Sequence, residues 1–245
     1  AVKALKPCTM NFATSLLNGY SLQRRIPVAG GIIMSDSVQP ISEELMERGP
    51  VDRRVHTVRL KGLGGEGIAT LVHAICHPVH EMCLPHISSE FPGEMCLELE
   101  RSLGNGTPFF LNGAAGDTNP PTVSMGPAYA HKHGQALARI AEMTDGDVAV
   151  DTAVFRFAHQ EIQLPARPEA NVPRPDALAR ISAIRVGTLA VLFLPGEPFV
   201  ETALAIERLS PFEHTIVVGF SENNIGYIPT DVAFDQGGYE VGPGK

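Results

Sequence analysis

Alternating runs of apolar and polar residues divide the chain into strand-like and helix-like segments. Short runs rich in β-branched and aromatic residues, bounded by glycine, proline or polar turns, predict strands. Apolar residues that recur every three to four positions predict helices. The predicted helices span 41–49, 93–104, 129–143 and 199–210, and the predicted strands span 54–60, 68–76, 108–113, 152–164, 181–186, 188–195 and 215–220.

This alternation of element types predicts an α/β fold, with a mixed β-sheet core flanked by helices. Residues 180–195 have the pattern of a β-hairpin, and the glycine-rich 62–67 has that of a hairpin turn. The segment 164–180 carries four prolines and is the one predicted linker or insertion. We find no internal repeat and expect a single domain over 1–245.

Composition limits the classes of function. The net charge of −8 argues against a nucleic-acid partner, and no run of eighteen apolar residues predicts a transmembrane segment. The four cysteines form no CxxC pair, so we expect free, mostly buried thiols. With neither a disulfide pattern nor a signal peptide, the sequence favours an intracellular protein, and the compartment and oligomeric state stay open.

Three histidines stand close together in "LVHAICHPVH" (71–80). His73, His77 and His80 would share one face of a helix, but the preceding apolar, β-branched run predicts a strand that Pro78 ends. His77 would then lie where the strand stops, which is where α/β sheets usually carry their chemistry. The pattern is not HExxH, so a metal ligand and a hydrogen-bonded structural histidine are both open.

Three further polar clusters each follow a predicted strand. Strand ends in one sheet favour a shared pocket, although a capped turn, a helix cap and packed tyrosines would also explain these residues. No P-loop and no GxSxG motif accompanies them. The candidates are Asp117 and Asn119 in "NGAAGDTNP", Glu197 in "LPGEPFVE", and Tyr227 and Tyr239 in "GYIPT" and "GGYE".

Together with "HPV" at 77–79, these motifs in this order resemble the neutral (non-lysosomal) ceramidase family. The paired arginines of "QRR" (23–25) and "GPVD" (49–52) are similar to further family motifs. The resemblance extends from about Gln23 to Glu240, and the twelve-residue spacing of Tyr227 and Tyr239 also matches. It implies an α/β catalytic domain with one zinc ion that hydrolyses the amide bond of ceramide.

Site residues follow from this resemblance. It implies that His77, Glu197 and Tyr227 bind zinc, and that Tyr239 polarises the substrate carbonyl with Arg24 beside it. Asp117 belongs to the family's Gly-Asp turn, and His73 and His80 are expected to be structural or peripheral. The expected partner is a small-molecule amide or a lipid-like substrate.

Two departures from the family pattern leave alternatives. Asn119 stands where the ceramidases have a serine, which favours a hydrolase acting on another amide or ester; the Asn119 amide is then a candidate donor to an oxyanion. A second zinc histidine, found further upstream in the family, has no counterpart in residues 1–22. We therefore expect a catalytic domain without its N-terminal segment, or a non-catalytic relative that has lost the metal.

Overall fold

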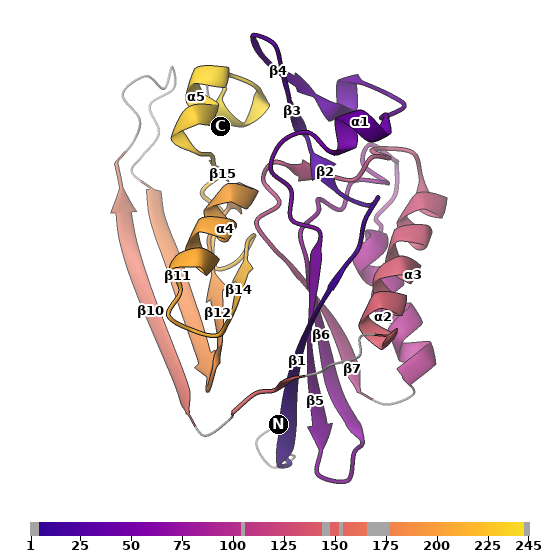
Figure 1. The fold of residues 1–245 in the computed structure, drawn as a ribbon, viewed down its shortest axis with the longest axis vertical. Coiled ribbons are helices and arrows are strands. Elements are labelled where there is room, and N and C mark those ends of the chain that lie inside the picture. Colours follow the sequence, from indigo (N-terminus) through magenta and orange to yellow (C-terminus); the bar gives the residue numbers. More distant parts are fainter. Residues whose placement is uncertain (1–4, 104–105, 144–147, 152–153, 166–176, 243–245) are drawn as a thin grey trace.

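Two β-sheets lie side by side in the structure, a computed structural model that describes residues 5–103, 106–143, 148–151, 154–165 and 177–242. Helices α2 (Glu90–Leu103) and α3 (Pro127–Met143) cover the outer side of one sheet, and α4 (Val200–Leu209) packs against the other (Figure 1). The predicted α/β class with mixed sheets and flanking helices is confirmed.

The larger sheet has the order β7-β6-β5-β1-β9. Its neighbours run antiparallel except for β6 and β7, which are parallel because α2 connects them. Buried side chains of β5 and β6 pack with Phe91, Met95 and Leu137 from α2 and α3. The strands are β1 (Cys8–Leu16), β5 (Arg54–Gly62), β6 (Gly67–Ala74), β7 (Thr107–Asn112) and β9 (Val148–Ala149).

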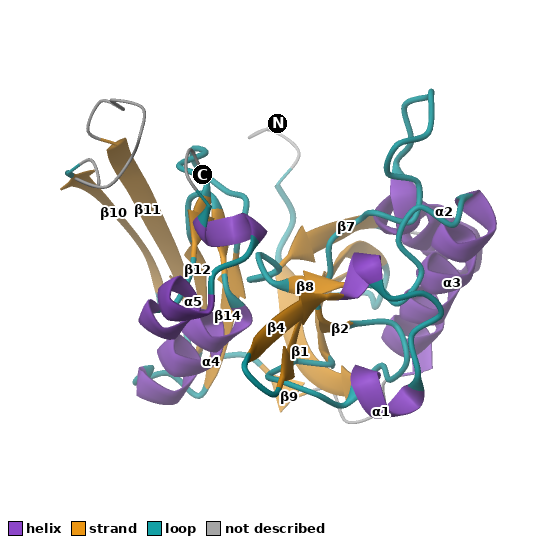
Figure 2. Ribbon diagram, turned by 90° about the horizontal axis from the view of Figure 1, so that it is seen from above, coloured by secondary structure: helices purple, strands orange, loops and turns teal. Residues whose placement is uncertain are grey.

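The smaller sheet has the order β10-β11-β12-β14. Only its β12–β14 pair is parallel, and α4 forms that crossover. The long β10–β11 hairpin projects away from the rest of the molecule (Figure 2). The strands are β10 (Phe155–Leu164), β11 (Ala177–Val186), β12 (Leu189–Phe193) and β14 (His214–Val218).

Short elements connect the two sheets at one end of the strands (Figure 1). Each of their strands pairs with one other: β2 with β8, β3 with β4, and β13 with β15. They are β2 (Leu22–Gln23), β3 (Arg25–Val28), β4 (Gly31–Met34), η2 (Ser35–Ser37), α1 (Glu43–Met46), β8 (Thr118–Asn119), β13 (Glu197–Pro198), β15 (Tyr227–Ile228), α5 (Asp231–Gln236) and η3 (Tyr239–Val241).

Some expectations need correction. Strand β1 is absent from the predicted elements, because its Thr, Asn and Ser residues obscure the apolar pattern. The predicted linker or insertion at 164–180 follows β10, and its last four residues belong to β11, which pairs with β10; residues 166–176 lie outside the described part. Of the free cysteines, Cys76 is buried and Cys83 is exposed. No helix in the described ranges is long and apolar enough to cross a membrane.

Candidate functional site

The turn after β7, residues 113–119, forms backbone hydrogen bonds with three other segments that carry candidate residues. The Arg24 amide donates to the Asp117 carbonyl at 2.8 Å, and the His77 amide donates to the Thr118 carbonyl at 3.0 Å. The Gly116 amide donates to the carbonyl of Pro198, next to Glu197, at 2.9 Å. One turn therefore positions three segments that are far apart in the sequence.

Gly116 permits the closest of these approaches. A Cβ atom at this position would lie 2.4 Å from the Glu197 carbonyl oxygen and 2.8 Å from that of Pro198. Both atoms belong to the backbone, so neither can move aside as a flexible side chain would. The "NGAAGDTNP" turn needs glycine here because only hydrogen leaves room for β13.

Glu197 and Tyr227 are brought together by local strand pairing. β13 and β15 run parallel with Glu197 opposite Tyr227, and the Glu197 amide donates to the Gly226 carbonyl at 2.9 Å. Pro198 does not open the following helix, which begins at Val200. The helix-cap explanation of Glu197 is therefore wrong. The Val200 amide at the start of α4 donates instead to the Asp117 carboxylate, at 2.8 Å.

His77 contacts Glu197 directly. Its strand ends earlier than expected, at Ala74, and the imidazole Nδ1 faces the Thr118 carbonyl oxygen at 3.1 Å. A carbonyl only accepts, so Nδ1 carries the proton and Nε2 points at the Glu197 Oε2 at 3.0 Å. His77 and Glu197 are both largely buried, which strengthens the interaction between them.

Neighbouring groups shift the pKa values of two of these residues. Burial raises the pKa of Glu197, but the contact with His77, the hydrogen bond from Tyr227 and the charge of Arg24 outweigh it and lower that pKa overall. Burial raises the pKa of Tyr227, against the effect of Arg24. Glu197 is therefore held as a carboxylate, and Tyr227 as a neutral phenol when no cation is bound.

Arg24 lies beside both tyrosines. Its guanidinium carbon is 5.2 Å from the centre of the Tyr227 ring and 5.7 Å from that of Tyr239, and the two rings meet edge to face at 5.7 Å. Both Arg24 and Arg25 are buried, so neither is a solvated surface arginine. The Arg24 Nη2 is itself buried without a hydrogen-bond partner in the described residues.

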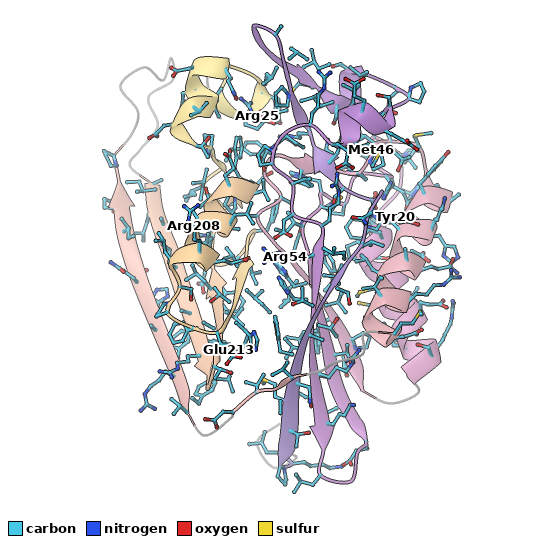
Figure 3. All side chains as sticks on the ribbon, viewed as in Figure 1. Tyr20, Arg25, Met46, Arg54, Arg208 and Glu213 are labelled. Atoms are coloured by element: carbon cyan, nitrogen blue, oxygen red, sulfur yellow. The ribbon has the colours of Figure 1, made fainter. Side chains whose placement is uncertain are left out.

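Glu240 holds this arginine pair and was missed in the sequence. Its side chain is fully buried and accepts from Arg24 Nε at 2.6 Å and from Arg25 Nη1 at 2.5 Å. Arg25, the first residue of β3, also donates to the Gly237 carbonyl at 2.7 Å, and its side chain extends towards α5 (Figure 3). Two adjacent buried arginines require a carboxylate, and the glutamate of "GGYE" was the available signal.

The remaining predicted residues differ in their placement. Tyr239 begins η3 and is half exposed, so its ring is accessible to a ligand. Asn119 is 5% exposed, in β8 opposite Leu22, and its Oδ1 is buried without a described partner. Both residues lie in the segments around the site.

Asp117 lies behind the site. Its Oδ2 accepts from Gln23 Nε2 at 2.7 Å and its Oδ1 from the Val200 amide, so it joins β2 to α4. Burial raises its pKa to about 6, although both hydrogen bonds favour the charged form. With both oxygens engaged and 1% of the residue exposed, Asp117 is placed to position the turn rather than to contact a substrate.

The other two histidines of 71–80 are engaged elsewhere. His73 donates from Nε2 to the Val217 carbonyl at 2.9 Å and stacks on His56. His80 pairs with His133 at 3.0 Å and with the Thr122 hydroxyl. Both are 2% exposed, and each holds elements of the core together.

Few side chains of the usual metal-binding types lie near His77. Within the described residues, no group of three or more His, Cys, Asp or Glu side chains is arranged to hold a metal ion. The predicted set contributes His77 and Glu197 of these types, and Tyr227 supplies a phenol as the third donor. A metal at this place would therefore depend on the tyrosine oxygen.

Comparisons with known proteins give a structural match. No family model and no curated protein matches the sequence. The structure of neutral ceramidase from Pseudomonas aeruginosa superposes with a TM-score of 0.75 at 15% identity, over 98% of this chain and 49% of that one. A structure described as ceramidase complexed with C2 gives a TM-score of 0.75 at 13% identity, over 98% and 51%.

These values show a shared fold. The resemblance to neutral ceramidases, first carried by short motifs, is confirmed at the level of the fold across nearly the whole chain. This chain spans about half the length of both structures. Fold alone does not determine activity, which has to be argued from the site.

Proposed function

We propose that this protein is a zinc-dependent amide hydrolase of the ceramidase type, with His77, Glu197 and Tyr227 as the metal ligands. The observation that carries the proposal is the 3.0 Å approach of His77 Nε2 to Glu197 Oε2. Because Nδ1 donates to Thr118, a neutral His77 directs a lone pair at a carboxylate. Such a contact is stable only with a proton or a cation between the two atoms.

The donor set fits zinc. Imidazole nitrogen and carboxylate oxygen bind zinc at about 2.0–2.2 Å, which puts two ligand atoms of a tetrahedral site about 3.3 Å apart. The Nε2–Oε2 separation is near this value, and Tyr227 interacts with the same carboxylate. The Thr118 carbonyl fixes the tautomer that leaves Nε2 free, as such partners do in many zinc sites.

The residues around the ligands suit the cleavage of an amide. When bound, zinc would supply Lewis acidity, which polarises a carbonyl and makes water nucleophilic near neutral pH. Arg24, with a buried and unpartnered Nη2, and the accessible Tyr239 would donate hydrogen bonds to the carbonyl oxygen as negative charge develops on it. The assignment of a general base stays open.

The same contact supports a second candidate, a non-catalytic relative. A proton on His77 Nε2 would turn the pair into an ion pair with equal geometry, and Asn119 replaces the serine of the ceramidases. In that case the pocket would bind a ligand without cleaving it. A hydrolase acting on another amide or ester is the third reading, favoured by the same asparagine.

Turnover of N-acyl substrates tests the proposal. A panel with one acyl chain and different amine groups, including ceramide, is incubated with zinc-loaded protein and release of the free amine is measured. We expect hydrolysis that falls more than about 100-fold in His77→Ala and is unchanged in His86→Ala, which alters an exposed histidine paired with Glu81. Turnover of another amide but not of ceramide contradicts the ceramidase assignment, and no turnover at all contradicts the hydrolase.

A further inference from the structure

A cavity of about 390 Å³ borders Glu197 and is not used by the proposed chemistry. Gly196 and Glu197 form one wall, and residues 220–224, between β14 and β15, form the other. Neither Arg24 nor the two tyrosines contribute to it. The cavity is therefore a second region that borders Glu197, distinct from the Arg24 region.

Hydrogen bonds hold the 220–224 wall in place. The Phe220 amide donates to the Gly196 carbonyl at 2.8 Å, and the Gly196 amide donates to the Asn223 carbonyl at 2.9 Å. The Asn223 side chain accepts from the Arg180 amide and donates to the Leu178 carbonyl, both in β11. These bonds maintain positive φ angles of 54° at Phe220 and 61° at Glu222, so the wall is preformed.

Phe220 separates the cavity from the histidine. Its ring meets the His77 ring edge to face at 5.5 Å, and 43% of the residue is exposed. An apolar face thus stands directly beside the proposed ligands, while the rest of the wall is polar. A ligand in the cavity would meet an aromatic surface near the reacting atoms and hydrogen-bonding groups further out.

The charges of the two regions differ in sign. Glu222 and Glu197 are the ionisable residues that line the cavity, and no lysine or arginine does. Among the described residues, none forms a hydrogen bond or an ion pair with the exposed Glu222 side chain. The region beside Tyr227 instead contains Arg24, whose buried Nη2 lacks a hydrogen-bond partner in the described part. The ionisable groups of one region are carboxylates, and the other region carries a guanidinium group.

Amide hydrolysis produces fragments with the same contrast. Water adds its oxygen to the carbonyl carbon, the C–N bond breaks, and nitrogen takes a proton. The products are a carboxylic acid, which ionises, and an amine, which is protonated near pH 7. A carboxylate suits the arginine and phenol donors, and an ammonium or hydroxyl group suits a carboxylate acceptor.

We propose that the cavity between Gly196 and residues 220–224 is the subsite for the amine half of the substrate, with Glu222 binding its ammonium or hydroxyl groups. The acyl half then lies towards Arg24, Tyr227 and Tyr239. This inference rests on the proposed amide hydrolysis and adds the place of the amine half and the residue that binds its polar groups. Phe220 contacts the carbon atoms next to the nitrogen.

Equilibrium binding of the two product types tests the subsite. The probes are 2-amino-1-octanol and octanoate, below their micelle concentrations, titrated calorimetrically into the wild type, Glu222→Gln and the control Glu142→Gln. Glu142 is an exposed glutamate of α3, on the other side of the larger sheet from this cavity. Loss of one charge-assisted hydrogen bond predicts about tenfold weaker amine binding in Glu222→Gln, and unchanged octanoate binding.

The outcomes separate the subsite from the enzyme. Amine binding that does not depend on Glu222, or octanoate binding that does, overturns the subsite even if the protein hydrolyses amides. Amine binding that weakens only in Glu222→Gln supports the subsite, even if no amide is turned over and the hydrolase proposal fails. In an active enzyme, the same variant raises KM for substrates with a hydroxylated amine half about tenfold, and changes kcat little.

Discussion

Glu240 is the residue on which the arrangement of Arg24 depends. Its carboxylate lies between two buried guanidinium groups and uses Arg24 Nε, which leaves Nη2 directed elsewhere. A glutamate can bind both arginines because its carboxylate has two oxygens, one for each guanidinium group. The buried charge pair thus aligns the arginine that the proposed chemistry uses.

Replacing this carboxylate has a large effect on stability. Glu240→Gln leaves two buried cations without an anion, and we expect the free energy of unfolding to fall by about 3–5 kcal/mol, measured by urea denaturation. Glu44→Gln, which removes an exposed partner of Arg48, serves as the control and costs less than about 1 kcal/mol. Equal losses in the two variants would contradict the described role of Glu240.

At this scale the sequence predicted which candidate side chains lie close together better than it predicted their hydrogen-bond partners. His77, Glu197 and Tyr227 were selected from motifs, and they do lie together. Asp117 was selected too, but its oxygens are taken by Gln23 and a helix amide. Hydrogen-bond partners come from distant segments, and a linear pattern of residue types carries no information about them.

Elements meet in the core through a stack of aromatic rings. Phe12 of β1 lies between His56 of β5 and His214 of β14, and His56 stacks in turn on His73 of β6. Burial lowers the pKa of His56 to about 3 and that of His73 to about 4, so both are neutral in the folded protein. The stack therefore joins the two sheets through uncharged rings.

Stability should therefore decrease in acid. Below about pH 6.5 the unfolded chain binds protons at these histidines and the folded chain does not. The free energy of unfolding therefore falls as the pH falls from 6.5 to the folded-state pKa, about 3 for His56 and about 4 for His73. For His56 the loss is about 3 kcal/mol by pH 4. His56→Phe keeps a ring in the stack and should remove this part of the slope.

Urea denaturation between pH 4 and 7 measures that slope. The surface variant His131→Gln, on α3, controls for removal of a histidine. If His56→Phe has the same pH dependence as the wild type, His56 binds protons equally in the folded and the unfolded chain, and the described role of the stack is wrong.

Packing of the 113–119 turn against β13 gives a prediction at the level of elements. Gly116→Ala forces a Cβ atom against two backbone carbonyls, so β13 must move, at a cost of about 1–3 kcal/mol. We expect weaker zinc binding as well, because β13 carries Glu197. Both quantities are measured on the purified variant, by denaturation and by metal titration.

Gly64→Ala provides the comparison for Gly116→Ala. In the β5–β6 turn only the flexible Glu66 side chain lies within 4 Å of the added atom, so the effect on stability should stay within about 1 kcal/mol. Zinc affinity that is unchanged in Gly116→Ala would show that the turn does not position Glu197.

The sequence predicted most elements because hydrophobic period and breakers are local signals. Most predicted ranges lie near the observed elements. These are helices α2, α3 and α4 and strands β5, β6, β7, β10, β11, β12 and β14. Strand β1 was missed, although it lies between β5 and β9, because its neighbours rather than its composition make it a strand. Burial of a polar segment depends on partners that periodicity does not specify.

At the scale of the molecule, the site exists because two sheets end beside each other. The larger sheet leads into His77 and the 113–119 turn, and the smaller sheet leads into Glu197 and the 220–224 wall. Polar clusters after strands predicted a shared pocket, but not that it spans two sheets. Strand pairing depends on contacts between residues far apart in the sequence. The parallel pairs that α2 and α4 connect can therefore be identified only in the folded structure.

Zinc content measured by elemental analysis tests the central claim most directly. Purified protein supplied with zinc and then freed of excess metal should hold about one zinc per chain, and His77→Ala and Glu197→Gln should each lose most of it, while His86→Ala retains it. A wild type that holds no zinc after it has been supplied, or variants that bind as much as the wild type, would contradict the proposed metal centre of His77, Glu197 and Tyr227.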